Sequence, residues 1–171
     1  MNETPATATE TDMQAQAGTD QYLTFMLAGE EYGVDILRVQ EIKGWDSVTP
    51  IPNTPDFVLG VINLRGAVVP IVDLRRCFKL DASAFGPTTV VIVLRAAGEK
   101  HDRTVGIVVD AVSEVYNVPE DGVGPTPELG DKIDINFIKG LARVGEKMVI
   151  LLDIDHLISF DDIAFAQSVN H

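Results

Sequence analysis

Hydrophobic and polar positions along the chain predict short β-strands separated by tight turns. Residues 22–27 (YLTFML) and 32–36 (YGVDI) are rich in aromatic and β-branched side chains, which favour a pleated, half-buried surface. The polar stretch 28–31 (AGEE) predicts a turn that joins them as a hairpin. Residues 36–42 (ILRVQEI) fit a short helix or an extended strand, because periodicity over so few residues does not decide between the two.

A second hairpin is predicted in residues 60–74 (GVINLRGAVVPIVDL), where two apolar strands meet at residues 63–66. Prolines between residues 50 and 55 break regular structure before this hairpin. Asp56 is placed to cap a short helical turn that leads into it. Further along, residues 88–94 (TTVVIVL) are apolar on both faces, as expected of a central strand.

The second half of the chain repeats the pattern of the first. Residues 57–60 (FVLG) match 137–140 (FIKG), and 69–74 (VPIVDL) match 149–154 (VILLDI), in both cases 80 positions on (137 − 57 and 149 − 69). Shorter matches at a shift of 73 (105 − 32 and 112 − 39) join 32–34 to 105–107 and 39–42 to 112–115. Two copies are too few for a solenoid, and they predict two similar units of about five strands each, packed side by side. Closure of each unit into a small barrel is expected, because it removes exposed strand edges.

The remaining segments are expected to be tails and loops. Residues 118–132 predict a long acidic loop, and residues 96–103 an exposed hairpin loop. Apolar positions between residues 157 and 165 predict an amphipathic C-terminal helix. The expected organisation is a disordered tail at 1–20, a domain at 21–161 with repeat motifs at 32–78 and 105–158, and a tail or helix end at 162–171.

Composition narrows the class of protein. The chain has 171 residues, 46% of them hydrophobic, so it can bury a core of its own. Its formal net charge of −13 disfavours nucleic acid and anionic lipid as partners. The single cysteine, Cys77, lies among apolar neighbours and is expected to be a buried free thiol in a reducing compartment. Neither a secretory signal nor an apolar run long enough to cross a bilayer is visible, so a cytoplasmic protein without direct membrane insertion is expected.

A search for catalytic chemistry finds little. The histidines lack a His or Cys neighbour at metal-ligand spacing, and no phosphate-binding glycine loop or nucleophile elbow is present. Asp153, Asp155 and His156 form the best metal or hydrolase candidate, yet they follow a strand, where carboxylates commonly form turns. Trp45 fits either an anchor on a partner surface or packing inside a barrel. The sequence therefore favours a binding protein without a cofactor over an enzyme.

Arg65 is a charge at the tip of an apolar hairpin, and its role is open at this point. It is either a solvated surface charge or a planar donor that pairs with a carboxylate or with backbone carbonyls across the cleft between the two units. Glu41 is the natural partner by charge. The cleft between the two units could also hold a small molecule, which would make the chain a ligand-binding barrel.

A set of motifs in fixed order resembles the CheW family of bacterial chemotaxis adaptors. The motifs are EEYGVDIL, NTPDF, NLRG and VPIVDLR, followed by TTVVIVLR, TVGIVVDAVSEV and FIKGLARVGEKMVILLDIDHL. The resemblance covers roughly residues 21–161, and the first four motifs are specific only in combination. It implies a mainly β fold of two five-stranded SH3-like barrels with a groove between them, short helices and a C-terminal helix.

The resemblance also implies a function without catalysis. Proteins of this kind couple the cytoplasmic tips of chemoreceptors to the histidine kinase CheA, whose regulatory domain has the same architecture. They work in the cytoplasm and are recruited to membrane-bound receptor arrays. By analogy, Val39 and Glu41 help to form the receptor-binding surface, and Arg65 takes part in coupling receptor to kinase. Apolar groove lining is implied for Val90, Val112 and Val115, whose alternative role is plain barrel core.

Overall fold

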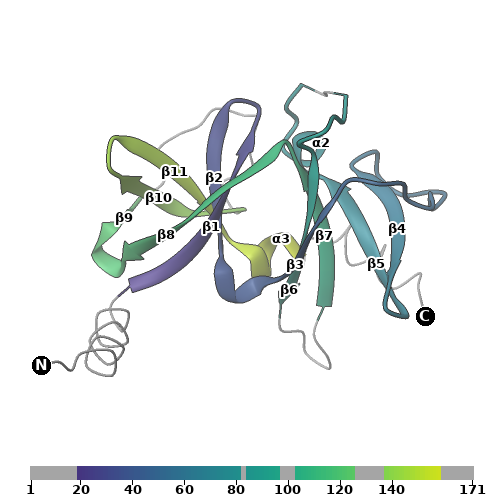
Figure 1. Cartoon of the computed structure of the whole chain (residues 1–171), viewed down its shortest axis with the longest axis horizontal. Coiled ribbons are helices and arrows are strands. Elements are labelled where there is room, and N and C mark those ends of the chain that lie inside the picture. Colours follow the sequence, from purple (N-terminus) through teal and green to yellow (C-terminus); the bar gives the residue numbers. More distant parts are fainter. Residues whose placement is uncertain (1–18, 82–83, 97–102, 126–136, 159–171) are drawn as a thin grey trace, which may run out of the picture.

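The protein consists almost wholly of β-strands arranged in two sheets (Figure 1). The structure is a computed structural model that describes residues 19–81, 84–96, 103–125 and 137–158. Sheet A has six strands, in the order β8 (Ala111–Pro119), β1 (Thr19–Leu27), β2 (Glu30–Asp35), β11 (Lys147–Leu152), β10 (Ile138–Val144), β9 (Val123–Gly124). Sheet B has five, in the order β3 (Val39–Gly44), β6 (Val90–Ala96), β7 (Arg103–Val109), β5 (Ala67–Asp73), β4 (Val58–Leu64).

Short helical elements connect these strands. They are η1 (Ile36–Arg38), α2 (Leu74–Cys77), η2 (Glu120–Gly122) and α3 (Ile154–Ile158). Asp35 begins η1 by accepting a hydrogen bond from the Leu37 N–H. Asp73 does the same for α2, through the Arg75 N–H. No helix in the described ranges has the length and apolar character needed to cross a membrane.

The two halves of the chain exchange strands. The chain passes from sheet A to sheet B through η1 and returns at Asp110, so sheet B is built from the continuous stretch 39–109. In sheet A, β11 of the second half pairs in parallel with β2 of the first, with Leu151 opposite Gly33. In sheet B, β5 of the first half pairs in parallel with β7 of the second, with Ile71 opposite Gly106. The two repeated units are therefore intertwined, and neither is a successive half of the chain.

Each sheet curls round on itself. The segment that follows one edge strand, β3 in sheet B or β8 in sheet A, pairs with the far end of the same sheet. Beyond β3, Thr49 exchanges two backbone hydrogen bonds with Val61 of β4, at 2.9 and 2.8 Å. Beyond β8, β9 pairs with β10 in the same way. Gly60 permits the first contact, because a Cβ atom there would lie 2.3 Å from the Thr49 carbonyl oxygen. Gly140 has the same position in the second repeat, where a Cβ would lie 2.7 Å from the Gly124 oxygen.

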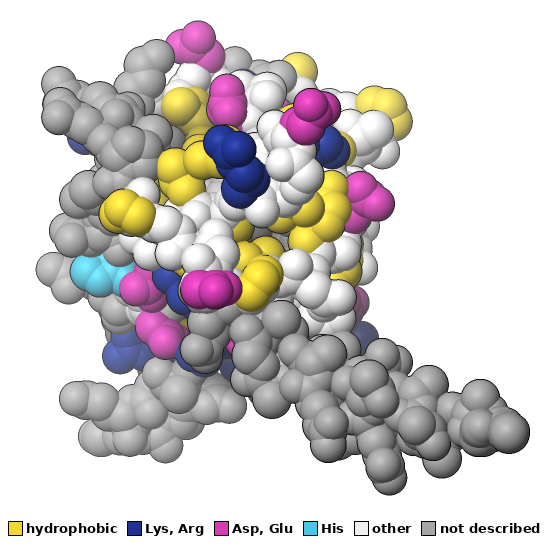
Figure 2. All heavy atoms as spheres, turned by 90° about the vertical axis from the view of Figure 1, so that its left-hand side faces the viewer, with side chains coloured by type: hydrophobic (Ala, Val, Ile, Leu, Met, Phe, Trp, Pro, Cys, Tyr) yellow, Lys and Arg dark blue, Asp and Glu magenta, His cyan; other side chains and the backbone are white. Residues whose placement is uncertain are grey.

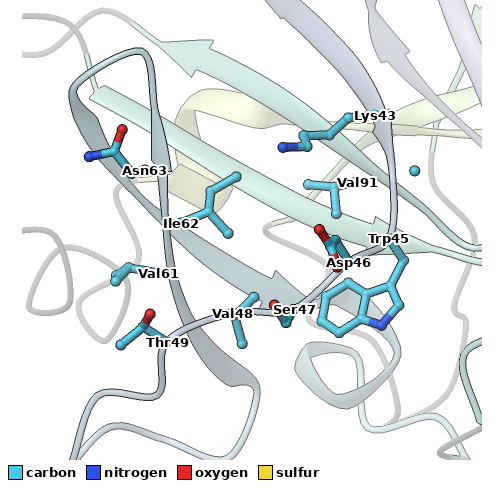
Figure 3. Close-up of a pocket in the computed structure, with 11 residues that line it drawn as sticks. Lys43, Trp45, Asp46, Ser47, Val48, Thr49, Val61, Ile62, Asn63 and Val91 are labelled. Atoms are coloured by element: carbon cyan, nitrogen blue, oxygen red, sulfur yellow. The ribbon is translucent and has the colours of Figure 1, made fainter.

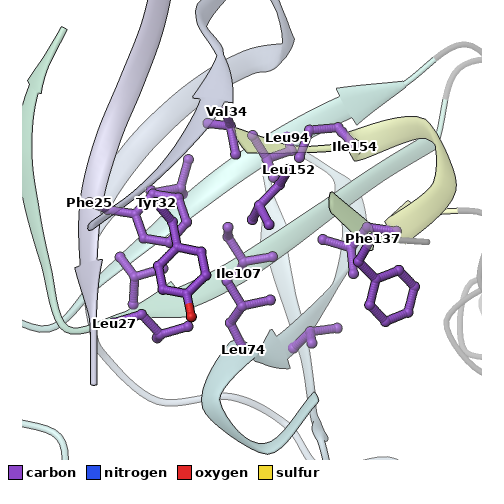
Figure 4. Packing of buried hydrophobic residues seen from close by; sticks show 14 of the residues in the cluster. Phe25, Leu27, Tyr32, Val34, Leu74, Leu94, Ile107, Phe137, Leu152 and Ile154 are labelled. Carbon is purple, nitrogen blue, oxygen red and sulfur yellow. The ribbon is translucent and has the colours of Figure 1, made fainter. Parts of the chain in front are cut away.

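The largest hydrophobic core lies between the two sheets (Figure 4). Sheet A contributes Phe25 and Tyr32, whose rings stack with centroids 5.9 Å apart, and sheet B contributes Leu94 and Ile107. A smaller apolar cluster lies inside each sheet. Because the core between the sheets is larger than the cluster inside either sheet, we expect the two sheets to fold as a single cooperative unit.

Several sequence-based expectations are corrected by the structure. Residues 36–42 are neither all helix nor all strand, since η1 leads directly into β3. Asp56 lies in a turn and caps no helix. The expected loop 118–132 contains η2 and β9 in its described part, and β1 begins at Thr19, inside the expected tail. The tip of the 96–103 loop, most of the expected C-terminal helix and the two outer tails lie outside the described residues.

A candidate partner-binding surface on sheet B

Arg65 occupies a strained two-residue turn at the tip of the β4–β5 hairpin. Arg65 and Gly66 both have positive φ, at 53° and 87°, as in the mirror-image turns that suit the twist of a hairpin. Glycine adopts this conformation freely, whereas arginine does so at a cost. Asn63 supports the turn, because its side-chain oxygen accepts a hydrogen bond from the Gly66 N–H at 3.0 Å. The turn projects the Arg65 side chain outward, where 70% of its surface is exposed.

Glu41 reaches the same place from β3. A β-bulge lies between the Val39–Leu94 and Glu41–Val93 pairs, which makes Gln40 the extra residue in the strand. Arg65 Nη1 lies 2.7 Å from Glu41 Oε1, and the glutamate side chain is 24% exposed. Arg65 thus has a carboxylate partner, but both residues belong to sheet B, so, contrary to expectation, the ion pair does not cross the cleft between the two units. An ion pair this exposed contributes between about 0 and 1 kcal/mol to stability.

Two partly exposed apolar side chains lie close in the sequence to the residues of the ion pair. Ile42 follows Glu41 on β3 and is 43% exposed, while Val68 lies near the base of the Arg65 turn and is 44% exposed. In β3 the usual pattern is inverted, since Ile42 faces water and the charged residues Glu41 and Lys43 are half-buried. Sequence reasoning missed both apolar residues, because the alternation along each strand predicts buried apolar side chains there. Large exposed apolar groups beside an oriented charge are typical of a contact surface.

The predicted valines do not all gather at this ion pair. Val39, Val90 and Val112 are half-buried and pack against the core between the sheets. Val115 is 48% exposed and lies on β8 of sheet A, opposite Leu23. The predicted residues thus fall into three groups: the Glu41–Arg65 pair, three valines at the inter-sheet core, and Val115 on the other sheet.

The face of sheet A carries apolar side chains as well. Figure 2 shows the side of the molecule on which sheet A lies, with hydrophobic side chains scattered among acidic and basic ones. Val115 and Met148 are each 48% exposed in this sheet. Such a mixed surface suits a protein partner. A polyanion would require a continuous basic surface instead.

The predicted metal or hydrolase candidate has structural roles instead. Asp153 Oδ1 accepts a hydrogen bond from the His156 N–H at 3.0 Å at the start of α3. Asp155 forms a 3.0 Å ion pair with Arg38 of η1. Within the described ranges, no three His, Cys, Asp or Glu side chains are placed to hold a metal ion.

The pKa values of Asp110 and Tyr32 are shifted by contacts that hold the fold together. Arg75 of α2 donates two hydrogen bonds to the Asp110 carboxylate, at 2.9 and 2.6 Å, and these lower the pKa of Asp110. Burial, with the nearby Glu30 carboxylate, raises the pKa of Tyr32 to about 12. Both groups lie where the sheets meet, so these interactions serve the fold.

Comparison with known proteins agrees with this architecture. Residues 21–162 match the family described as CheW-like domain. The chain is 44% identical over 162 residues to the chemotaxis protein CheW of Klebsiella aerogenes, covering 95% of each chain. It is 35% identical over 145 residues to that of Rhizobium meliloti, covering 85% of this chain and 91% of the other.

A solved structure resembles the chain in three dimensions. The scaffolding protein TtCheW from Thermoanaerobacter tengcongensis superposes with a TM-score of 0.74 and 34% sequence identity, over 84% of this chain and 94% of that one. Sequence and structure agree, and the chain therefore belongs to the CheW-like family of chemotaxis adaptor proteins.

Proposed function

We propose that this protein couples the cytoplasmic tips of chemoreceptors to the regulatory domain of the histidine kinase CheA. It acts in the cytoplasm at membrane-bound receptor arrays, by contact alone and without catalysis. Family membership supports this proposal, and the observation that carries it is the exposed Arg65–Glu41 ion pair. Because that pair adds little to folding, its strained turn is better explained by contact with a partner.

Arg65 retains hydrogen-bonding capacity for a partner. A guanidinium has five N–H donors, and the 2.7 Å contact with Glu41 uses Nη1. The other donors can bind a carboxylate or a carbonyl oxygen on an incoming protein, while Glu41 fixes the direction of the side chain. We expect the receptor to bind as a helical hairpin in a groove, with Val39 as an apolar contact.

The kinase is expected to bind a barrel face by apolar contact between units of similar shape. Ile42 and Val68, both partly exposed in sheet B, are suited to this role. An interface of this kind buries about 800 Å² per partner, or less if it is transient. Signal transfer then requires contacts that differ between the active and inactive states of the kinase.

Co-sedimentation with receptor signalling fragments and CheA tests the proposal. Arg65→Ala and Glu41→Lys should reduce recovery of the ternary complex and of receptor-controlled kinase activity, while both variants melt near the wild-type temperature. Arg143→Ala is the matched control, because Arg143 is an exposed arginine on β10 of the other sheet. Wild-type coupling by both variants would refute the assignment, and a large loss of thermal stability in Arg65→Ala would identify a structural arginine.

A further inference from the structure

A hollow of about 260 Å³ lies in sheet B where β3 and β4 separate (Figure 3). It is lined by residues 43–49 and 61–63, together with Val91 of β6. Along both strands these segments lie between the Thr49–Val61 bridge and the Glu41–Arg65 ion pair. Since a water molecule occupies about 30 Å³ in the liquid, the hollow has room for a molecule of roughly nine heavy atoms.

Two side chains of opposite charge line this hollow. Lys43 and Asp46 both lie on its lining, and in the described part of the chain neither has an ion pair or a side-chain hydrogen bond. In Figure 3 the Lys43 ammonium reaches from β3 toward β4, and Asp46 lies on the same side of the hollow. Asn63 lies on the opposite strand, but its side chain points away from Lys43 and holds the hairpin turn by accepting the Gly66 N–H.

Three apolar side chains in the lining, Trp45, Ile62 and Val91, are firmly placed. Val91 is 3% exposed, and Ile62 is half-buried beside it in the same cluster. The Trp45 indole packs edge-on against Phe85 with ring centroids 4.5 Å apart. The Trp45 N–H donates to the Thr89 carbonyl oxygen at 3.1 Å, which fixes the backbone at this point. A ligand that binds here therefore meets a prearranged apolar wall.

We propose that this hollow binds a free α-amino acid with an aliphatic side chain. Its carboxylate pairs with the Lys43 ammonium, and its ammonium pairs with Asp46. Its side chain packs against Ile62, Val91 and Trp45. The two charges do not pair with each other, so a ligand carrying both opposite charges satisfies them together. The site is a property of sheet B alone and does not depend on the proposed coupling function.

The site also adjoins the candidate partner surface. Lys43 follows Glu41 by two positions on β3, and side chains two apart in a strand project from the same face. An amino acid bound to Lys43 would lie beside the Glu41–Arg65 ion pair, where it can alter how that pair meets a partner.

Trp45 provides a direct assay, because it is the only tryptophan in the chain. The purified full chain is titrated with L-leucine, with isopentylamine, which lacks the carboxylate, and with 4-methylpentanoate, which lacks the ammonium. We expect a saturable change in fluorescence with L-leucine. Each analogue should bind roughly tenfold more weakly, since a hydrogen bond to a charged group contributes about that factor.

Substitutions test each charge separately. Lys43→Met should bind L-leucine no better than isopentylamine, and Asp46→Asn should bind it no better than 4-methylpentanoate. Lys79→Met and Asp121→Asn are the matched controls, because both residues are exposed and lie away from the hollow, and they should bind like the wild type. Circular dichroism confirms that each variant is folded.

Backbone NMR of the wild-type protein gives a second measurement that needs no variant. L-leucine should shift amide resonances in residues 43–49 and 61–63. The proposal is overturned if L-leucine produces no saturable change, if the shifts fall elsewhere, or if Lys43→Met and Asp46→Asn both bind it like the wild type.

Discussion

Asp110 lies where the chain returns from sheet B to sheet A, and its carboxylate joins three parts of the molecule. It accepts two hydrogen bonds from Arg75 of α2, at 2.9 and 2.6 Å, and a third from the Ala28 N–H at 2.9 Å. Ala28 lies in the turn between β1 and β2, so this carboxylate ties sheet A to the helix that ends β5. The substitution Asp110→Ala removes all three hydrogen bonds.

The loss of stability expected for Asp110→Ala depends on how exposed the Asp110 side chain is. Hydrogen bonds to a charged group each contribute about 1.5–3 kcal/mol, but the Asp110 side chain is 32% exposed and water can replace part of each. We therefore expect Asp110→Ala to lose about 2 kcal/mol in total. For a domain of this size, that lowers the melting temperature by roughly 4–8 °C.

The second repeat supplies a matched control. Asp155 of α3 pairs with Arg38 of η1 at the other crossover, but its side chain is 58% exposed. Asp155→Ala should therefore cost less than about 1 kcal/mol. Thermal denaturation at pH 7, followed by circular dichroism, compares the two variants. If they melt at the same temperature, or if Asp155→Ala melts lower, the account of the Asp110 crossover is wrong.

The pH dependence gives a further check on Asp110. Arg75 lowers the pKa of Asp110 below its ordinary value of 3.8, so the folded state favours the charged carboxylate. The resulting stabilisation is complete above pH 3.8 and is lost as the pH falls through the lower folded-state pKa. The stability difference between wild type and Asp110→Ala should therefore shrink in strong acid, and a difference that stays constant there would contradict the ion pair.

Other substitutions test the closure, the helix start and the shared core. Gly60→Ala should cost roughly 2–4 kcal/mol in urea unfolding, because its Cβ would strike the Thr49 oxygen, whereas Gly44→Ala, with no atom within 4 Å, should change stability by less than about 0.5 kcal/mol. Burial raises the pKa of Asp73, which means that the folded state disfavours its charged form, so Asp73→Asn should be at least as stable as wild type at pH 7. Asp73→Ala should lose about 1 kcal/mol, because it removes the hydrogen bond that caps α2. Leu94→Ala should cost about 3 kcal/mol and leave one unfolding transition for both sheets, and two separate transitions would contradict a shared core.

The strands and hairpins could be predicted because their signals are local. Arg65-Gly66 between two apolar runs marks a hairpin tip, and the match between residues 57–60 and 137–140 reappears as the same β-bulge in both hairpins. The pairing of Glu41 with Arg65 was predictable only by charge, and the 2.7 Å contact bears it out.

The strand exchange could not be predicted from the sequence. Gly33 and Gly106 have equivalent positions in the two repeats, so either could face either returning hairpin with the same local pattern. The choice depends on where the chain crosses between sheets, which is decided by long-range packing. The exposure of Ile42 and Val68 was hidden for a related reason, since both look like ordinary strand residues until their neighbours are known.

The continuous course of sheet B affects how the protein is made on the ribosome. All strands of sheet B lie between residues 39 and 109, whereas β1 and β2 must wait for β8 and β11, which are synthesised later. A nascent chain that has emerged only to about residue 110 holds every strand of sheet B, but the β1–β2 hairpin then lacks the two strands that pair with its edges. Such unpaired strand edges invite aggregation during synthesis. The last strand to leave the ribosome, β11, is thus the one that covers the free edge of β2, one of the first two strands made.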